Sequence, residues 1–385
     1  MVDGSRPALP AAPDYATGTL ASVLPAVARS LGSIRYASAP DLRLGGAQRA
    51  VVVLVDGLGY AQLVRRSGHA PFLREHLPSA RRLDSGFPST TATAMGSLGT
   101  GAPPGGHGLV GYEVLDPAED RVFNELSWEN GPDPFTWQPM PTVFQEVAAE
   151  GLDVTRIGPG FFDGSGLTNA ALRGGRFRAA SSLADRVTAA VEAVRSAPRA
   201  LVYVYWGDVD KIGHVHGPSA WEWVDELESV DRHLAQLAAA VPAGTAVHIT
   251  ADHGMVDVPF ANRVDMAAEP ELWRGLRHIA WEPRATQLHV EPGATVSVAE
   301  RWQNRLGESA RVVTRDELVA GGWFGAVRPE VLPRIGDVLV LMLHDGAVVD
   351  SERMRPELVR LRGFHGSVTD EERQVPLITV PARTA

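Results

Sequence analysis

Three continuous apolar stretches predict strands that are buried on both faces of a sheet. The first, at 51–55, has five aliphatic residues, four of them β-branched, and the others lie at 200–206 and 246–250. Such runs are typical of parallel strands that helices cover on both sides. Segments with helical spacing of apolar positions, at 182–195 and 220–240, separate the strands. This alternation predicts an α/β fold with a doubly wound, mostly parallel sheet.

Shorter patterns predict further elements of the same fold. We expect a loose arm over 1–15 and a helix over 20–31 that ends at Gly32. A run of small residues at 88–101 begins with Pro-Ser and predicts an N-capped, closely packed helix. The remaining predicted elements are helices at 60–66 and 142–150, strands at 153–157 and 375–380, and a pair of short strands at 108–115 and 121–126.

The pattern changes after about residue 256, where strands and helices become short and mixed. The segment predicts a helix at 296–306, a strand pair at 338–343 and 347–349, and further short elements at 286–290, 311–313 and 315–320. We therefore predict three parts. These are an N-terminal arm and helix at 1–45, an α/β core at 46–256 plus 361–385, and a small α+β cap inserted at 257–360.

Each of the three apolar strands ends in acidic residues. Asp56 follows the first strand, Asp208 and Asp210 follow the second, and Asp252-His253 follows the third. Ligands of open α/β sheets bind outside the carboxyl ends of the strands, so these side chains are predicted to share one site. A single aspartate at a strand end would be a weak signal.

Histidines accompany these carboxylates at informative spacings. Asp210 and His214 are one helical turn apart and could contact one ion, although a surface Asp-His pair would look the same. Asp252-His253 could equally be an N-cap with a hydrogen-bonded histidine, and His365, between glycines, is by itself more typical of a loop. The combination favours a metal site over these alternatives.

Six groups supply oxygen and nitrogen ligands: Asp56, Asp210, His214, Asp252, His253 and His365. Such ligands suit Zn²⁺, with Mn²⁺ as the alternative. Six are too many for one tetrahedral ion but fit a pair. Two ions about 3.5–4 Å apart can hold the entering and leaving oxygens of a phosphoryl displacement, which predicts a dinuclear hydrolase.

A hydroxyl nucleophile is available in Pro88-Ser89-Thr90-Thr91. A threonine at a helix N-terminus lies near unpaired N–H groups and the positive end of the helix dipole. A metal ion on its oxygen would favour the alkoxide. Without the metal ligands, simple N-capping would explain the same residues.

Composition narrows the setting of this chemistry. The 385-residue chain has no cysteine, which excludes disulfides, a thiolate nucleophile and Cys-ligated zinc. A net charge of −10 argues against a stable nucleic-acid complex but not against a small anionic substrate. No apolar run approaches the roughly 20 residues of a membrane span, and 1–13 lacks the layout of a secretory signal. We therefore expect a cytoplasmic protein without membrane association, and the sequence leaves a homo-oligomer open.

The ordered motifs resemble the alkaline phosphatase superfamily, and within it the type I phosphodiesterase/nucleotide pyrophosphatase family. The matching motifs cover about residues 48–256 and 360–382. They are Asp56-Gly; Pro88-Ser-Thr-Thr91 with Thr100-Gly101 and His107-Gly108; Asp210-x-x-Gly-His214-x-x-Gly-Pro218; Asp252-His253-Gly-Met255; and Gly363-x-His365-Gly.

This resemblance implies a role for each matched residue. Asp210, His214 and His365 would hold one ion, and Asp56, Asp252, His253 and the nucleophile oxygen would hold the other. The family's nucleophile stands nine residues before the Thr of its Thr-Gly pair, which points to Thr91, with Thr90 as the fallback. The implied reaction is in-line attack by Thr91, a phospho-threonine intermediate, and its hydrolysis by water. A binding protein without turnover is disfavoured because none of the seven positions is lost.

Departures from the family pattern concern the substrate. Ala92 stands where nucleotide-cleaving members have an aromatic residue, and Tyr112 replaces an asparagine that holds a phosphate oxygen, so Tyr112 or nearby Asn124 is predicted to bind substrate. Trp281, Trp323 and Phe324 could stack on a base or fill a core, and core packing is favoured. We expect hydrolysis of phosphodiester or pyrophosphate bonds in small substrates such as nucleotides. A phosphomonoesterase or phosphonate monoester hydrolase is the alternative.

Overall fold

A seven-stranded sheet forms the centre of the computed structural model, which describes residues 7–384. Its strand order is β2-β17-β8-β1-β7-β5-β6. β1 pairs in parallel with β7 and β8, and β17 runs antiparallel to both of its neighbours. The strands are β1 (Arg49–Val55), β2 (Arg81–Asp84), β5 (Asp153–Gly158), β6 (Arg176–Ala179), β7 (Ala200–Trp206), β8 (Thr245–Thr250) and β17 (Gln374–Val380). The predicted fold class is confirmed.

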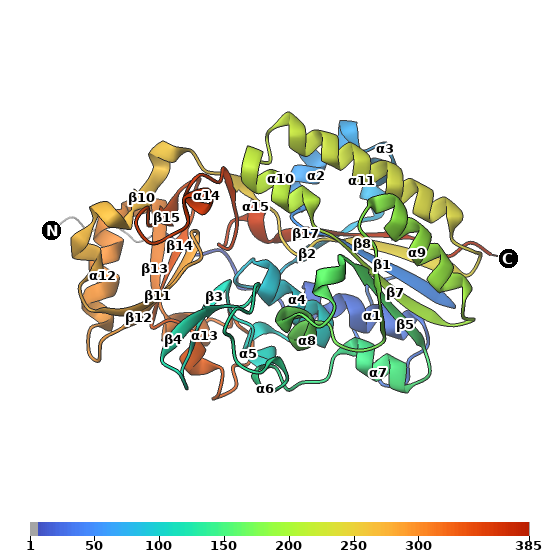
Figure 1. Ribbon diagram of the computed structural model, residues 1–385, viewed down its shortest axis with the longest axis horizontal. Coiled ribbons are helices and arrows are strands. Elements are labelled where there is room, and N and C mark those ends of the chain that lie inside the picture. Colours follow the sequence, from blue (N-terminus) through green and yellow to red (C-terminus); the bar gives the residue numbers. More distant parts are fainter. Residues whose placement is uncertain (1–6, 385) are drawn as a thin grey trace.

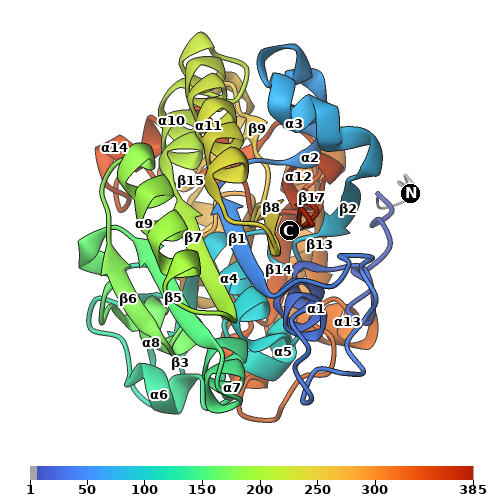
Figure 2. The ribbon, with the colours of Figure 1, turned by 90° about the vertical axis from the view of Figure 1, so that its right-hand side faces the viewer.

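Helices cover both faces of this sheet (Figure 1). Figure 2 shows β1, β7 and β5 side by side between the two helical layers. One layer consists of α2 (Tyr60–Arg65), α3 (Pro71–His76), α9 (Leu183–Arg195), α10 (Asp208–His216) and α11 (Trp221–Ala240). The other contains α1 (Val23–Ser30), α4 (Thr91–Thr100), α7 (Val143–Ala149) and α8 (Gly166–Ala171), with α5 (Pro104–His107) and α6 (Pro134–Trp137) beside it.

Sequence signals account for where these helices begin. Thr142 and Gln145 form a reciprocal capping box at α7, and Ser182 and Asp185 form one at α9. The predicted helix at 20–31 is a short 3₁₀ turn followed by α1. Residues 1–6 of the predicted arm lie outside the described residues.

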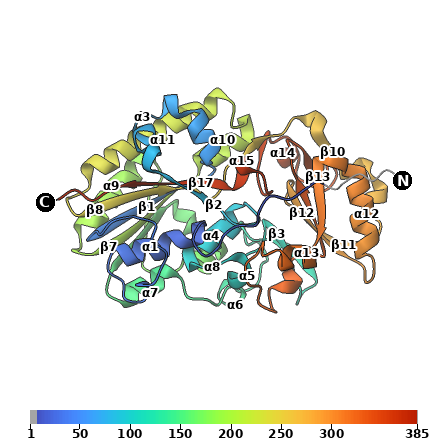
Figure 3. The same cartoon turned by 180° about the vertical axis from the view of Figure 1, so that it is seen from behind.

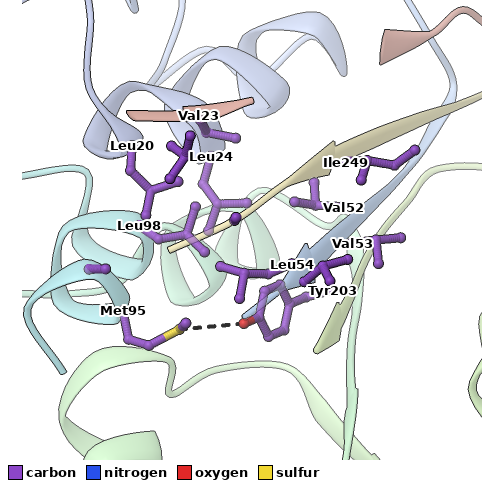
Figure 4. Close-up of a cluster of buried hydrophobic side chains, with 14 of the residues drawn as sticks. Leu20, Val23, Leu24, Val52, Val53, Leu54, Met95, Leu98, Tyr203 and Ile249 are labelled. Carbon is purple, nitrogen blue, oxygen red and sulfur yellow. Dashed lines mark hydrogen bonds between the residues drawn. The ribbon is translucent and has the colours of Figure 1, made fainter. Parts of the chain in front are cut away.

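The sheet and α4 meet in a cluster of buried, mostly apolar side chains (Figure 4). Leu54 of β1 and Tyr203 of β7 lie against Met95 and Leu98 of α4, and all four are buried. The Tyr203 hydroxyl donates to the Met95 sulfur at 3.5 Å. Full burial of a Leu or Met side chain contributes about 1.5–3 kcal/mol, so this packing fixes α4 firmly against the strands.

A second sheet, of four strands, lies at the opposite end of the molecule (Figure 3). Its order is β11-β12-β14-β13, and α12 (Thr295–Leu306) packs on it through the fully buried Trp302. The strands are β11 (Leu276–Ala280), β12 (Ala285–Val290), β13 (Ala310–Thr314) and β14 (Val338–Met342). The division of the chain at 257 and 360 stays a prediction.

One expected strand pairing is wrong. β14 does not pair with β15 (Ala347–Val349) but lies between β12 and β13, whereas β15 pairs in parallel with β10 (Arg263–Asp265). The apolar runs located both strands, but every position of both is buried, so neither run has a polar face that could indicate the partner strand. The remaining elements are β3 (Glu113–Asp116), β4 (Arg121–Asn124), β9 (Val256–Asp257), β16 (Gly363–Phe364), α13 (Arg315–Ala320), α14 (Pro356–Val359) and α15 (Asp370–Arg373).

Buried contacts join the two sheets. Arg284, beside β12, forms a two-pronged ion pair with Glu372 of α15, and both side chains are fully buried. Trp323 and Phe324 are buried against Phe87 at ring-centroid distances of 5.3 and 5.2 Å, in agreement with the core-packing interpretation. Among residues 7–384, no helix combines the length and apolarity needed to cross a membrane.

Candidate dinuclear active site

The ends of β1, β7 and β8 bring the candidate ligands together. Gly57, directly after Asp56, has a φ of 75°, and a Cβ built on it would lie 2.8 Å from Cα of Asp210. Only glycine combines this left-handed conformation with such a close approach. The turn after β1 therefore lies directly against Asp210, in the first turn of α10. The last turn of the same helix carries His214.

The first candidate metal group consists of Asp210, His214 and His365. Nε2 of His214 lies 3.4 Å from Oδ2 of Asp210, and Nε2 of His365 lies 3.8 Å from Oδ1 of the same carboxylate. The ligand atoms all lie within 4.8 Å of one another. His365 follows β16, which pairs with β9 just after the Asp252-His253 motif, and this pairing places the distant histidine here.

The second group consists of Asp56, Asp252 and His253, all of them buried. Nε2 of His253 lies 3.4 Å from Oδ1 of Asp56 and 3.6 Å from Oδ2 of Asp252. The rings of His253 and His365 stack at a centroid distance of 3.6 Å, so the two groups are direct neighbours. The structure thus assembles all six predicted side chains into two adjacent sets of three.

Hydrogen bonds orient these side chains for cation binding. Nδ1 of His214, His253 and His365 lies 2.8–3.0 Å from the carbonyl oxygens of Gly363, Gly254 and Ser89, respectively. A carbonyl oxygen only accepts, so each Nδ1 carries the proton and each Nε2 keeps its lone pair. One buried oxygen of each carboxylate has no hydrogen-bond partner, namely Oδ1 of Asp56, Oδ1 of Asp210 and Oδ2 of Asp252. The donor set fits two divalent cations.

The electrostatics of the metal-free protein also favour cations. Burial, with Asp252 and Asp210, raises the pKa of Asp56 well above its ordinary value. Burial, with His253 and His214, lowers the pKa of His365 well below its ordinary value. Like charges crowd one another here, and divalent ions would stabilise the carboxylates and neutral imidazoles that metal binding requires.

Thr91 is the first residue of α4 and lies next to the second group. Its Oγ1 is 3.2 Å from Nε2 of His253. Thr90, the N-cap residue, is almost fully buried, and its side chain hydrogen-bonds with Glu282 rather than capping the helix. Thr91 is partly exposed to the cavity, so its hydroxyl is the one that an entering substrate can reach.

Two functional candidates were missed from the sequence. The Tyr205 hydroxyl donates to Oδ2 of Asp56 at 2.5 Å, and its pKa is raised well above 10 by burial and by Asp56, so it stays protonated. The signal was its alternation with Tyr203 at the end of β7, which directs both rings to one face. Glu282 lies beside Gly366 with Oε2 unpartnered, and burial raises its pKa to about 8. No local motif marks Glu282.

A cavity of about 1040 Å³ opens over both groups. Tyr112 and Asn124, the predicted substrate-binding residues, both line it and hydrogen-bond to each other. Asn124 Oδ1 accepts the backbone N–H groups of Leu126 and Ser127, so its amide nitrogen is the atom that donates to the Tyr112 oxygen. Trp281 lines the same cavity, unlike the core residues Trp323 and Phe324.

Comparisons with known proteins identify the family of this chain. The chain belongs to the type I phosphodiesterase/nucleotide pyrophosphatase family, whose model matches residues 50–368. It is therefore a phosphoester hydrolase of the alkaline phosphatase superfamily, a metal-dependent group. No curated protein matches the sequence.

Solved structures share the fold at low sequence identity. An inactive threonine-to-alanine variant of murine ectonucleotide pyrophosphatase/phosphodiesterase 5, in complex with AMP, matches with a TM-score of 0.68 and 17% identity, over 86% of this chain and 87% of that one. The human counterpart matches with a TM-score of 0.68 and 16% identity, over 87% and 88%. Phosphonoacetate hydrolase from Sinorhizobium meliloti 1021, in complex with phosphonoacetate, matches with a TM-score of 0.67 and 21% identity, over 86% of this chain and 90% of that one.

Proposed function

We propose that the enzyme cleaves phosphodiester or pyrophosphate bonds of small substrates, with Thr91 as nucleophile and two divalent cations, Zn²⁺ in preference to Mn²⁺, as cofactors. The position of Thr91 carries this proposal, because its hydroxyl lies 3.2 Å from a ligand of the second group and opens into the cavity. The inactive threonine variant of the murine structural neighbour supports a threonine in this role. Zinc, a cytoplasmic location and a homo-oligomer stay predictions.

The first group would hold one ion through Asp210, His214 and His365, and the second group would hold the other with Thr91. When bound, the ions supply positive charge for the oxygens that become negative during phosphoryl transfer. Oxygen and nitrogen donors without sulfur suit Zn²⁺ or Mn²⁺.

The chain itself positions the reacting groups. The N-terminus of α4 favours the deprotonated Thr91 oxygen through its unpaired N–H groups. As the bond from this oxygen to phosphorus forms, the bond to the leaving oxygen breaks, and the leaving group departs with the proton that Thr91 lost. Water then cleaves the phospho-threonine, which releases the phosphoryl product and restores the hydroxyl. Tyr112 and the amide of Asn124 are proposed to contact the remaining phosphate oxygens.

A phosphomonoesterase or phosphonate monoester hydrolase is the second candidate. Lys211, the only lysine in the sequence, and Arg355 are exposed side chains at the cavity lining, where they could meet the extra charge of a terminal phosphate. The phosphonate-cleaving structural neighbour points in the same direction. In both cases the partner is a small phosphate or phosphonate ester.

The decisive variant is Thr91→Ala, with Thr90→Ala as the matched control. Hydrolysis should be measured on zinc-loaded protein with bis-p-nitrophenyl phosphate, p-nitrophenyl phosphate, a p-nitrophenyl phosphonate monoester and ATP, and metal content by mass spectrometry. We expect Thr91→Ala to retain its metal and to lose turnover by roughly 10³-fold or more, the scale seen when a nucleophile is removed. Full activity of Thr91→Ala would refute the nucleophile assignment, and the preferred substrate separates the two candidate functions.

A further inference from the structure

A buried arginine lines the same cavity as the candidate metal groups. Arg156 lies on β5, opposite Tyr203 of β7 and Phe177 of β6. Only 8% of its surface is exposed, yet it borders the cavity together with Asp56 and Thr91. The cavity therefore continues from the reaction centre along the sheet to a positive charge.

Arg156 has no acceptor for its buried N–H groups. Its Nε and Nη1 are buried without a hydrogen-bond partner, and no ion pair joins it to any of residues 7–384. Three other arginines of this part of the chain are buried, Arg186, Arg284 and Arg334, and each donates to at least two carbonyl or carboxylate oxygens. An unpaired buried charge is costly unless a ligand or water satisfies it.

Neighbouring groups do not neutralise this charge. Burial lowers the pKa of Arg156, and the attraction of Asp163 and Tyr203 acts against that shift. However, Asp163 is exposed, and no hydrogen bond connects it to the guanidinium. Burial, with Asp252 and Asp56, raises the pKa of Tyr203 well above 10, so its phenol stays neutral. The positive charge of Arg156, at the border of the cavity, therefore lacks a full counter-charge.

Aromatic rings line the path between Arg156 and the metal groups. Tyr205 contacts Asp56 at one end, Phe162 lies 5.3 Å from the Tyr205 ring, and the guanidinium carbon of Arg156 lies 5.6 Å from the centre of Phe177. Tyr203 and Tyr205 point to the same face, and two strand residues span about 7 Å.

We infer that Arg156 is a specificity-determining residue that binds a second anionic group, a carboxylate or a further phosphoryl group, which an aromatic-lined part of the cavity separates from the phosphoryl group that is cleaved. This inference rests on the proposed function for the position of that phosphoryl group. The substrate class is thus an aromatic or similarly flat phosphoester with an anion at its far end.

Binding of non-hydrolysable probes tests the inference directly. Isothermal titration of zinc-loaded protein compares benzylphosphonate with 4-carboxybenzylphosphonate, with its neutral amide 4-carbamoylbenzylphosphonate, and with p-xylylenediphosphonate. We expect at least one of the two probes with a second anionic group to bind at least tenfold more tightly than benzylphosphonate, and the amide to show no such gain. The probe with the larger gain identifies the carboxylate or the phosphoryl group as the preferred anion.

Variants assign the gain to Arg156. In Arg156→Gln the affinity of the probe with a second anionic group, divided by the affinity of the carbamoyl probe, should fall to near one. Arg156→Lys should restore part of this ratio. Arg121→Gln is the control, because Arg121 also lines the cavity but already donates to the carbonyl of Asn130. Loss of the ratio in Arg121→Gln as well would indicate general attraction and overturn the inference.

The outcomes separate the two levels of the proposal. If no phosphonate binds zinc-loaded protein, the proposed function fails together with the inference. If benzylphosphonate binds and neither probe with a second anionic group gains affinity, only the inference fails. An independent check needs no ligand: Arg156→Met should melt at the same or a higher temperature, whereas Arg186→Met should melt lower because its acceptors lose their donor. An equal decrease in the melting temperature of both variants would show that Arg156 has only a structural role, and the inference would be overturned.

Discussion

The hydrogen bond from Tyr205 to Asp56 allows a quantitative test of the second metal group. In Tyr205→Phe the ring keeps its packing, and only the hydroxyl that donates to Oδ2 of Asp56 at 2.5 Å is lost. A hydrogen bond to a charged group contributes about 1.5–3 kcal/mol, and loss of a group that orients a metal ligand typically weakens metal binding about 10–100-fold. The two ranges agree, so we expect Tyr205→Phe to weaken metal binding at the second group about 10–100-fold.

The effect should be confined to one of the two ions. Oδ1 of Asp56, which has no hydrogen-bond partner, belongs to the group with Asp252 and His253, whereas Asp210 receives no bond from Tyr205. Competition of metal-free protein with a chromogenic chelator during a Zn²⁺ titration resolves the two binding steps. We expect one step to weaken and the other to keep its affinity.

Tyr203→Phe is the matched control for this experiment. Tyr203 lies two residues earlier on the same face of β7, and its hydroxyl donates only to the Met95 sulfur at 3.5 Å. Metal affinity in this variant should equal that of the unchanged protein. If Tyr203→Phe weakened zinc binding as much as Tyr205→Phe, or if Tyr205→Phe had no effect, the assignment of Asp56 as an oriented ligand would be refuted.

Three further predictions concern parts of the fold that support the site. Burial raises the pKa of Glu125 to about 8, so its stabilising contribution is complete below its ordinary pKa of 4.5 and is lost as the pH rises toward 8. In Glu125→Gln the free energy of unfolding, measured with urea, should therefore depend less on pH between 4.5 and 8. The exposed control Glu129→Gln should leave this pH dependence unchanged. Gly57→Ala should weaken both zinc-binding steps, because its Cβ would overlap Asp210, and Gly68→Ala, with nothing within 4 Å, should weaken neither. Arg284→Met should reduce the free energy of unfolding by about 3–5 kcal/mol, because it leaves Glu372 buried and unpaired. Adding Glu372→Leu should recover part of that loss. If the losses of the two single variants simply add in the double variant, the role of the ion pair is contradicted.

The sequence was most informative where strand periodicity and short-range motifs coincide. The apolar runs located β1, β7 and β8 within a residue or two, and their acidic ends lie together because parallel strands end at one edge. The six candidate ligands were therefore predictable as a set. Their division into two groups came from the family resemblance, and the geometry is consistent with it.

Features that depend on packing between distant segments were not predictable. Glu282 reaches Thr90 only because the second sheet folds back toward α4, and no local pattern encodes that approach. Arg156 occupies an ordinary position of β5, and its missing acceptor is visible only when every neighbour is placed. The predicted partner of β15 was wrong for the same reason, because the sequence of a short buried strand does not indicate which strand it pairs with.

The candidate cation ligands and much of the cavity wall come from different parts of the chain. Five of the six ligands stand at or near the ends of the central strands β1, β7 and β8, and the sixth, His365, follows β16. Trp281, Arg353 and Arg355 belong to other segments that border the same space. Substitutions at these three wall positions can alter which ester fits without replacing a candidate ligand. The architecture thus lets selectivity diverge among descendants of one ancestor while the reaction itself is inherited intact.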